Sequence, residues 1–218
     1  MHLAQYRRVK LELHLLGVPR MLRAGEPIPP LRGHKAWGIL AYLVLGPGRV
    51  NRQHLAALLF EDAEDPMAAL RWNLSELRRA LATNNLCGNP IAFCRDEIGS
   101  IDVDVLMHGH WSQALALAGL GDDLLAGINF SASPSFEVWL QMQRRRLHAT
   151  SEAVLREAAL AKLASGEVGA ASDLAARLVG LHPVDENQQV LLVRCLSAAG
   201  DGVGAARQAA ACRTLFAR

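Results

Sequence analysis

The sequence predicts a mainly α-helical protein with a small β component, and three patterns carry this prediction. Apolar and polar residues alternate over residues 11–15, which is typical of a strand with one buried face. Between residues 34 and 81 the apolar residues recur with the period of a helix instead. From residue 166 onward a unit repeats at an offset of 34 residues, which indicates stacked helix pairs.

Length and charge set the limits of the interpretation. A chain of 218 residues with 51% hydrophobic and 20% charged residues fits one or two ordinary folded domains. Nine basic residues and two acidic ones lie in the first 60 positions, whereas residues 108–218 hold ten of each. The N-terminal excess suits an anion-binding surface, although a weakly basic N-terminus is also common by chance.

The sequence contains neither a recognisable targeting segment nor a metal-binding cysteine pattern. The apolar run near the N-terminus is broken by Glu12 and His14, so it does not resemble a signal peptide. The longest apolar run, residues 114–127, is interrupted by Asp122 and Asp123 and is too short for a bilayer. The four cysteines have no zinc-ligand spacing and are expected to be reduced thiols. We therefore expect a soluble, cytoplasmic protein.

The first elements form a small sheet followed by helices. The strand over 11–15 is followed by "VPRML" and then by Ile28 after a turn, which predicts a small antiparallel sheet. Helical spacing over residues 34–45 ends at "GPG". A second helix is expected over residues 51–60, with Asn51 as its N-cap.

The helix predicted over residues 65–81 has two different sides. Asp65 suits its N-cap and Pro66 suits its first turn. Leucines recur along one side as a core stripe: Leu70, Leu74, Leu77 and Leu81. Two rows are predicted to face outward: Arg71, Ser75 and Arg78 in one, and Trp72, Glu76 and Arg79 in the other.

A hairpin is predicted to close this part of the chain. Alternation from Ile101 to Val105 predicts a strand, and "CRDEIG" at residues 94–99 suits a hairpin tip. The order of sheet, three helices and hairpin predicts a winged helix-turn-helix domain over residues 1–107. In such a domain the third helix enters the major groove, and the helix before it is braced on the DNA backbone.

The outward rows of the third helix have two interpretations. Arginine carries a fork of donors that fits guanine or phosphate, and Ser75 can donate to a phosphate or a base edge. An exposed Trp72 would be costly to leave in water without a partner. In the alternative, the charged face is simply solvated and Trp72 packs on the wing or the next domain. The order of the elements favours the reading of DNA.

The second half is predicted to be all-helical, over residues 111–218. One long helix is expected over 135–166, and the three arginines at 144–146 are expected to be solvated because they point in different directions. Gly166 and Gly200 begin the two repeats and suit helix ends in the left-handed conformation. A helix–turn–helix unit of 34 residues with alanines at the crossings predicts a tetratricopeptide-like domain.

Both halves also resemble known families. "ILAYLVLGPGRVNRQHLAALLF" (39–60) and "LSELRRAL" (74–81) resemble the OmpR/PhoB type of winged helix. "LLAGINFSASPSFEVWLQMQRRRL" (124–147) and the repeat after it are similar to the bacterial transcriptional activator domain (BTAD). The pair resembles the layout of the antibiotic-regulatory-protein (SARP) family of activators, over nearly the whole chain.

The resemblance implies a transcriptional activator that binds double-stranded DNA and contacts RNA polymerase or a sigma factor. A homodimer is left open, and no membrane partner is expected. By position it places base and phosphate contacts on the third helix, the start of the helix before it and the hairpin: Arg71, Trp72, Ser75, Arg78, Arg79, Arg52, Gln53 and Arg95.

Some residues depart from this pattern. The segment before the third helix is acidic, and Asp96 and Glu97 follow Arg95, which weakens the electrostatic attraction to DNA. The chain also ends inside a predicted helix, at "TLFAR", so we expect it to be part of a longer protein.

The sequence lacks the common motifs of enzymes and cofactor sites. The sequence has no phosphate-binding loop, no G-x-S-x-G and no H-E-x-x-H, so neither catalysis nor a cofactor is expected. His108 and His110 with Asp104 could bind a metal, but isolated His-x-His pairs on linkers rarely do. The alternative function is a protein–protein adaptor whose winged helix no longer binds DNA.

Overall fold

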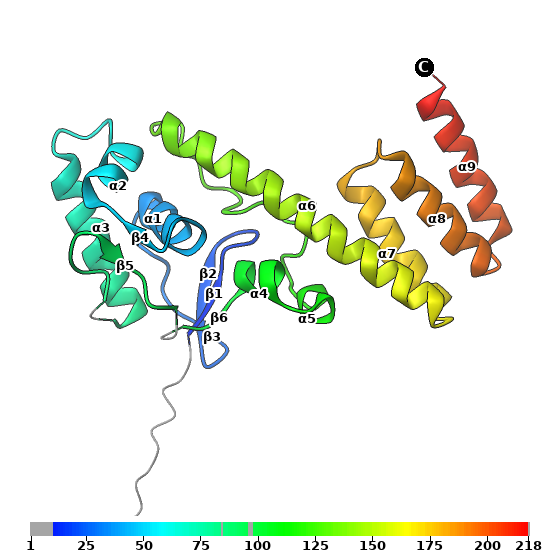
Figure 1. The fold of residues 1–218 in the computed structure, drawn as a ribbon, viewed down its shortest axis with the longest axis horizontal. Coiled ribbons are helices and arrows are strands. Elements are labelled where there is room, and N and C mark those ends of the chain that lie inside the picture. Colours follow the sequence, from blue (N-terminus) through cyan, green and yellow to red (C-terminus); the bar gives the residue numbers. More distant parts are fainter. Residues whose placement is uncertain (1–10, 84, 96–97, 218) are drawn as a thin grey trace, which may run out of the picture. The chain divides into compact units, whose positions relative to one another are not determined.

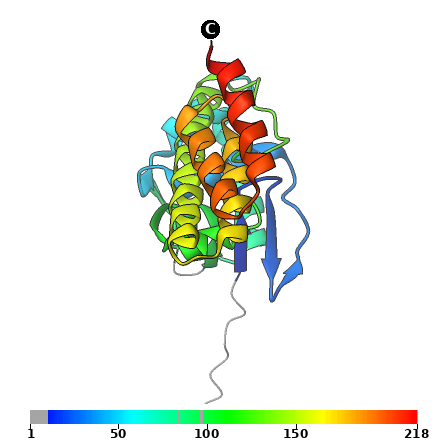
Figure 2. The ribbon, with the colours of Figure 1, turned by 90° about the vertical axis from the view of Figure 1, so that its right-hand side faces the viewer.

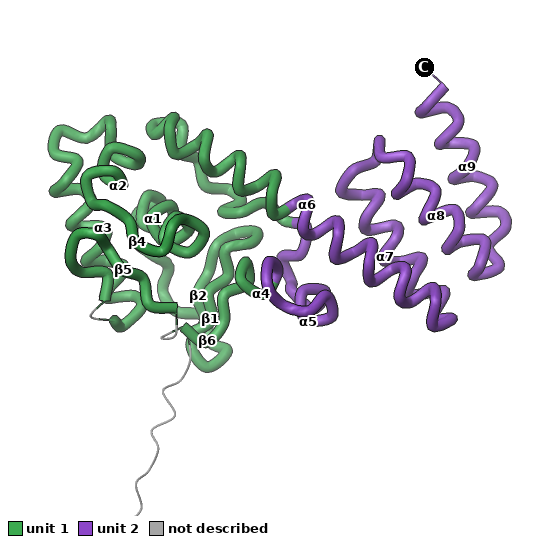
Figure 3. Tube along the Cα trace, in the orientation of Figure 1, with its two compact units in different colours: residues 1–105, 122–147 green, residues 106–121, 148–218 purple. Residues whose placement is uncertain are grey.

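The computed structural model describes residues 11–83, 85–95 and 98–217, and it divides into two compact units (Figure 3). Unit 1 comprises Met1–Val105 and Asp122–Leu147, and unit 2 comprises Leu106–Gly121 and His148–Arg218. The units therefore alternate along the sequence. The domain ranges predicted above, 1–107 and 111–218, are continuous and stay a prediction.

Unit 1 contains a four-stranded sheet in the order β3-β2-β1-β6 (Figure 1). Its strands are β1 (Leu11–His14), β2 (Arg20–Arg23), β3 (Glu26–Pro27) and β6 (Ile98–Ile101). The predicted antiparallel pairing is confirmed for β1 with β2 and for β2 with β3, whereas β6 pairs parallel to β1. Leu11 and Leu13 are buried and alternate with half-buried residues, as the period of two requires.

Three helices of unit 1 follow the sequence prediction closely: α1 (His34–Leu45), α2 (Arg52–Leu59) and α3 (Pro66–Leu81). The Asn51 side chain accepts from the backbone N–H groups of Gln53 and His54, which confirms it as the N-cap of α2. Asp65 caps α3 by accepting from the N–H of Ala68, with Pro66 in the first turn.

The strand predicted over residues 101–105 is wrong beyond Ile101, where β6 ends, because the chain turns there into helix α4 (Asp102–His108). The carboxylate of Asp102 is buried and accepts from the N–H groups of Leu15 and Leu16 at 2.9 and 2.8 Å. It also accepts from the backbone N–H of Val103 at 2.7 Å, in the first turn of α4. Burial raises the pKa of the Asp102 carboxyl, although these three donors oppose the shift. Asp102 thus joins the end of β1 to the start of α4.

The predicted hairpin is also wrong in its pairing. The short strand β5 (Ile91–Ala92) pairs with β4 (Arg49–Val50), whereas β6 pairs with β1. The two strands that were expected to flank one tip therefore belong to different sheets. The tip itself, at residues 96 and 97, lies outside the described residues.

The segment 122–147 belongs to unit 1 through its aromatic side chains. Phe130 and Phe136 are both fully buried, with their ring centroids 4.6 Å apart. Trp139, in the first half of α6 (Pro134–Ala164), lies 4.8 Å from the ring of Tyr42 in α1. A Cβ atom on Gly38 of α1 would lie only 2.8 Å from Phe130, so the glycine allows this close approach.

Backbone and side-chain hydrogen bonds reinforce the position of this segment. The N–H of Leu125 donates to the carbonyl of Leu15 at 2.9 Å, beside an isolated β-bridge between Leu16 and Leu124. Arg144 donates to the carbonyl oxygens of Leu124 and Leu125 at 2.9 and 3.3 Å. The prediction that all three arginines of 144–146 are solvated is therefore wrong for Arg144.

Unit 2 contains the repeat. Helices α7 (Val168–Leu181), α8 (Glu186–Ala198) and α9 (Gly202–Phe216) lie side by side (Figures 1 and 2), after the short helix α5 (Trp111–Leu115). Gly166 and Gly200 have φ values of 78° and 79°, which confirms their predicted left-handed conformation. No helix in the described part of the chain is both long and apolar enough for a bilayer.

The two repeats differ in what fills their helix contacts. Leu178 of α7 is fully buried, and its counterpart in α9 is Cys212. The Cys212 thiol donates to Oε1 of Gln189 in α8 at 3.6 Å. The Gln208 amide, also in α9, donates to the same Gln189 oxygen. The second interface is therefore partly polar.

Candidate nucleic-acid interface

Helix α3 is held in unit 1 by one apolar side. Leu70, Leu74 and Leu77 have no exposed surface, and Leu81 is half-buried near the helix end. Full burial of three leucines fixes the rotation of the helix about its own axis, because any rotation would expose them. The opposite side is therefore presented outward in a defined orientation.

The first outward row is confirmed as exposed at two of its three positions. Ser75 is exposed, and the Arg71 side chain is 58% exposed. The nearest acid to Arg71 is Asp65, with Nη2 to Oδ2 at 3.7 Å, and an exposed pair of this length holds the side chain weakly. Arg78 is half-buried, and its Nη1 donates to the Sγ of Cys87 at 3.5 Å.

The second outward row is only partly exposed. Trp72 is 54% exposed and the Arg79 side chain is 63% exposed, but Glu76 between them is 8% exposed. The prediction that Glu76 faces outward is therefore wrong. Its carboxylate accepts from Nη2 and Nε of Arg79 at 2.7 and 3.3 Å and from the backbone N–H of Arg32 at 3.1 Å.

These bonds lower the pKa of Glu76. The Arg79 guanidinium and then the Arg32 N–H hold the pKa of the Glu76 carboxyl below its ordinary value, because both stabilise the carboxylate. Arg32 itself is exposed, in the loop before α1. Sequence reasoning missed Arg32, and the only available signal was the excess of basic residues in the first 60 positions.

The remaining predicted residues lie outside α3. Arg52, at the start of α2, donates from its side-chain Nε to the carbonyl of Gly88 at 2.6 Å. Its backbone N–H donates to Oδ1 of Asn89 at 3.0 Å. Gln53 is exposed one residue further on. Arg95 is more fully engaged, because it donates to Oδ1 of Asp104 at 2.6 Å and to the carbonyl of Val44. The DNA contacts of these three residues stay a prediction.

The acidic segment between α2 and α3 is less negative than its sequence indicates. Lys35 Nζ lies 2.6 Å from Oδ1 of Asp62 and 5.0 Å from the centroid of the Phe60 ring. The hydrogen bond from Lys35 lowers the pKa of the Asp62 carboxyl. The pairing reduces the repulsion that this segment would exert on a phosphate chain.

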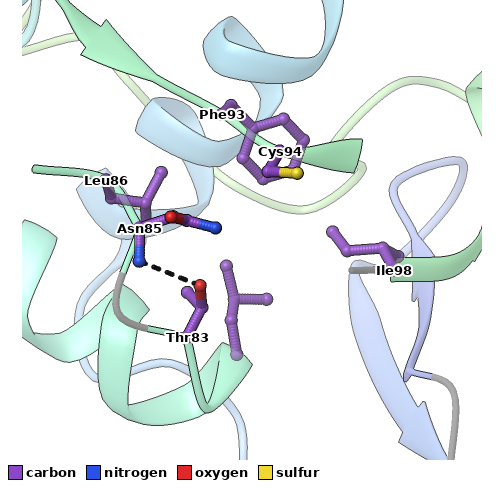
Figure 4. A pocket seen from close by; sticks show the side chains of 7 residues that line it. Thr83, Asn85, Leu86, Phe93, Cys94 and Ile98 are labelled. Atoms are coloured by element: carbon purple, nitrogen blue, oxygen red, sulfur yellow. Dashed lines mark hydrogen bonds between the residues drawn. The ribbon is translucent and has the colours of Figure 1, made fainter. Parts of the chain in front are cut away.

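A small pocket lies beyond the C-terminal end of α3 (Figure 4). Its volume is about 10 Å³, enough for one water molecule but not for a small-molecule ligand. It is lined by Leu81, Thr83, Asn85, Leu86, Phe93, Cys94 and Ile98. Figure 4 also shows the Asn85 N–H donating to Oγ1 of Thr83. The pocket therefore does not compete with the surface of α3 as the functional site.

The histidines considered for a metal have other contacts. His110 caps α5, and its Nδ1 lies 2.8 Å from Oγ of Ser112. Asp104 is paired with Arg95. Across residues 11–83, 85–95 and 98–217, His, Cys, Asp and Glu side chains form no group of three that could hold a metal ion.

Comparison with known proteins decides the family. The family model of the bacterial transcriptional activator domain matches residues 103–217. The chain belongs to this family. The resemblance to SARP-type activators is thereby confirmed, and the family is one of transcriptional regulators. No curated protein matches it.

One solved structure extends the comparison to the N-terminal part. Mycobacterium tuberculosis EmbR, in complex with a low-affinity phosphopeptide, has a similar fold with a TM-score of 0.64 and 19% identity. The similarity covers 95% of the BTAD chain and 60% of the EmbR chain. The predicted fold class, a winged helix-turn-helix followed by a helical domain, is confirmed.

Proposed function

We propose that this regulator binds promoter DNA through the outward side of α3 and acts as an activator in the cytoplasm. One observation carries the proposal. Three fully buried leucines fix α3, so that Arg71, Trp72 and Ser75 are presented on its exposed side. A rigid helix with exposed arginine and hydroxyl donors is the element that winged helices insert into the major groove.

Arg71 is the residue we propose to read a base. Its side chain is exposed and only weakly paired to Asp65, so its donors can turn to the O6 and N7 atoms of guanine. Ser75, one turn further along the same row, is placed to donate to a neighbouring base edge or phosphate. Arg78 follows, although its contact with Cys87 must rearrange before it can reach DNA.

Phosphate contacts are proposed for the start of α2. Gln53 is exposed there, and Arg52 carries a positive charge beside it. Arg95 contributes least in this proposal, because Asp104 offsets its charge. Phosphate contacts of this kind set the register of a protein on DNA without reading its sequence.

The helical repeat is proposed to hold the protein partner, either RNA polymerase, a sigma factor or a second subunit. Stacked helix pairs generally present an extended surface to peptides or proteins. Its exposed residues include Arg177 and Arg207, and residues 108–218 carry no net basic excess. The balance of charge favours a protein partner over a second DNA surface.

The test starts from selection of DNA sequences by the purified full chain, followed by binding titrations on the selected duplex. We expect Arg71→Ala to weaken binding by about 1–3 kcal/mol and to relax the preference at one base position. The double variant Arg71→Ala/Arg78→Ala should bind far more weakly. Arg177→Ala/Arg207→Ala removes the same charge from unit 2 and should bind like the unaltered chain.

The result also separates the activator from the alternative adaptor. If selection enriches no sequence and the Arg71/Arg78 double variant matches the unaltered chain at every salt concentration, the winged helix does not bind DNA. The full chain is required in this test, because a truncation near residue 110 removes Phe130 and Phe136 from the core of unit 1.

A further inference from the structure

We infer that Arg32 and Arg79, both held by the carboxylate of Glu76, form a clamp for the DNA phosphate backbone. The inference rests on the proposed DNA binding and deepens it, because it adds a contact from the loop before α1. It also assigns different roles to the two outward rows of α3. The row with Arg71 reads bases, whereas the row with Arg79 binds phosphate.

Glu76 is the residue that joins the two arginines. It is 8% exposed, and its carboxylate oxygens accept from Arg79 at 2.7 and 3.3 Å and from the Arg32 N–H at 3.1 Å. A buried carboxylate is stable only when such donors surround it. Here those donors come from α3 and from a loop 44 residues earlier. Glu76 therefore fixes the loop of Arg32 against the helix that carries Arg79.

Arg79 keeps donors available after this pairing. A guanidinium has five N–H groups, and the contacts with Glu76 use Nε and one side of Nη2. The side chain is still 63% exposed, so its remaining N–H groups face solvent. Because the guanidinium is already oriented, binding an anion costs less conformational entropy than it does for a free arginine.

Arg32 supplies the second positive charge. Its bond to Glu76 uses the backbone N–H, so the guanidinium is not consumed by the contact. The residue is exposed, and its charge is close enough to contribute to lowering the pKa of the Glu76 carboxyl. Two arginines share one carboxylate, which leaves a local excess of one positive charge for an anion.

Trp72 completes the surface beside the clamp. A Cβ atom on Gly33 would lie 3.8 Å from the Trp72 ring, so the loop of Arg32 turns against this side chain. The turn uses a φ of 86°, which glycine adopts readily. Trp72 remains 54% exposed and offers an apolar surface to a deoxyribose next to the bound phosphate. Flanking arginines around an exposed ring fit a sugar–phosphate chain.

Arg71 and Arg79 differ in their freedom, which is why we assign them different partners. Arg71 has one exposed acid at 3.7 Å, whereas Arg79 is bonded to a buried carboxylate at 2.7 Å. A base reader must place both ends of its guanidinium on one base edge. A tethered arginine that donates from its outer N–H groups suits a phosphate instead.

The test measures affinity for the selected duplex and for a scrambled duplex over a range of salt. Arg32→Ala and Arg79→Ala should each lower the slope of log affinity against log salt by about 0.9. If a variant and the unaltered chain bind equally at about 1 M salt, this change of slope makes the variant bind both duplexes about fivefold more weakly than the unaltered chain at about 0.15 M salt. Arg20→Ala, which removes an exposed charge from β2, is the matched control and should leave the slope unchanged.

The role of Glu76 as a positioning residue has a separate readout. Glu76→Gln adds one unit of positive charge, so a role in charge alone would make DNA binding tighter. If Glu76 positions Arg79, then Arg79→Ala should cost less than about twofold in the Glu76→Gln background, against about fivefold in the unaltered chain. An equal loss in both backgrounds would overturn the positioning role.

The outcomes separate this inference from the proposed function. If the unaltered chain binds DNA but Arg32→Ala has the salt slope of Arg20→Ala, the clamp is wrong and the proposed function stands. If the unaltered chain binds no duplex, both are wrong. Thermal unfolding of each variant identifies any loss that comes from folding, and in that case Arg32→Gln and Arg79→Gln repeat the test.

Discussion

The two compact units are built from helices that are packed by different kinds of side chain. In unit 1, leucines and aromatic rings fill the spaces between α1, α3 and the first half of α6, with Phe130 and Phe136 fully buried. In unit 2, the contacts of the repeat combine leucines such as Leu178 with small residues such as Ala171 and Ala175 and with amides such as Gln189. The interfaces of the repeat therefore differ from those of unit 1 in the alanines and amides that they contain beside leucines.

This difference explains why the BTAD match and the compact units do not coincide. The family model begins at residue 103, whereas residues 122–147 belong to unit 1. The buried ring of Phe130 and the half-buried ring of Trp139 both lie against α1. The opening part of the family domain is therefore part of the core that supports α3.

The largest effect is expected from loss of an aromatic ring in unit 1. Phe136→Ala should destabilise the protein by about 3–5 kcal/mol, because it removes a fully buried ring and leaves a cavity. Phe216→Ala, at the end of α9, is the matched control, since that ring is 38% exposed and should cost much less. Urea unfolding measures both, and equal losses would contradict the comparison.

The next effect concerns the two interfaces within the repeat. Leu178→Ala should cost about 2–5 kcal/mol, because Leu178 is fully buried between helices. Cys212→Ala changes the counterpart of Leu178 in α9. It removes one weak hydrogen bond and little side-chain volume, so it should cost about 1 kcal/mol of stability. Thermal unfolding of the two variants measures this difference. Equal shifts of the two unfolding midpoints would contradict it.

Two helical glycines should respond in opposite directions. Gly38→Ala in α1 should destabilise by about 1–3 kcal/mol, since the new Cβ would meet Phe130 at 2.8 Å and Leu59 at 3.1 Å. Gly169→Ala in α7 meets nothing within 4 Å and should stabilise by about 0.5–1 kcal/mol through helix propensity. Chemical unfolding should show opposite signs, and a loss in both variants would mean that the repeat is packed as tightly as unit 1.

The smallest effect is a dependence on pH. The folded pKa of Glu76 is lowered, so its stabilisation is present above the pKa of an unfolded glutamate and is lost as pH falls through the folded value. At neutral pH, Glu76→Gln should cost about 1 kcal/mol, and the difference should shrink below about pH 4.3.

The matched control for Glu76 is in unit 2. Glu167 also has a lowered pKa, because Lys162 donates to it at 2.6 Å, but this pair is exposed and screened by solvent. Glu167→Gln should therefore change stability little at any pH. Unfolding curves for both variants between pH 3 and 7 provide the measurement, and a larger effect at Glu167 would contradict the assignment of Glu76.

The local features of the chain were predictable from the sequence. Asn51 and Asp65 cap their helices as expected, because capping needs only a short side chain at the right position. The leucine stripe of α3 and the glycines at 166 and 200 were also predictable, since helical period and left-handed turns are local properties.

Other features depended on residues far away in the sequence. The alternation in "IDVDV" is compatible with a strand or with a short helix, and Asp102 decided for the helix by binding the N–H groups of Leu15 and Leu16. Helical period placed Glu76 on the outside of α3, but Arg32 covers it from the loop before α1. No pattern within one element carries that information.

The sequence by itself determined α1, α2 and α3, the caps of α2 and α3, the 34-residue repeat and the leucine stripe that α3 buries. These follow from propensity, period and short-range hydrogen bonding, which act over one or two turns. Only the tertiary structure decided that residues 122–147 belong with α1 and that Glu76 connects Arg32 to Arg79. Both depend on burial between distant segments, because a ring or a carboxylate leaves water only where another part of the chain surrounds it.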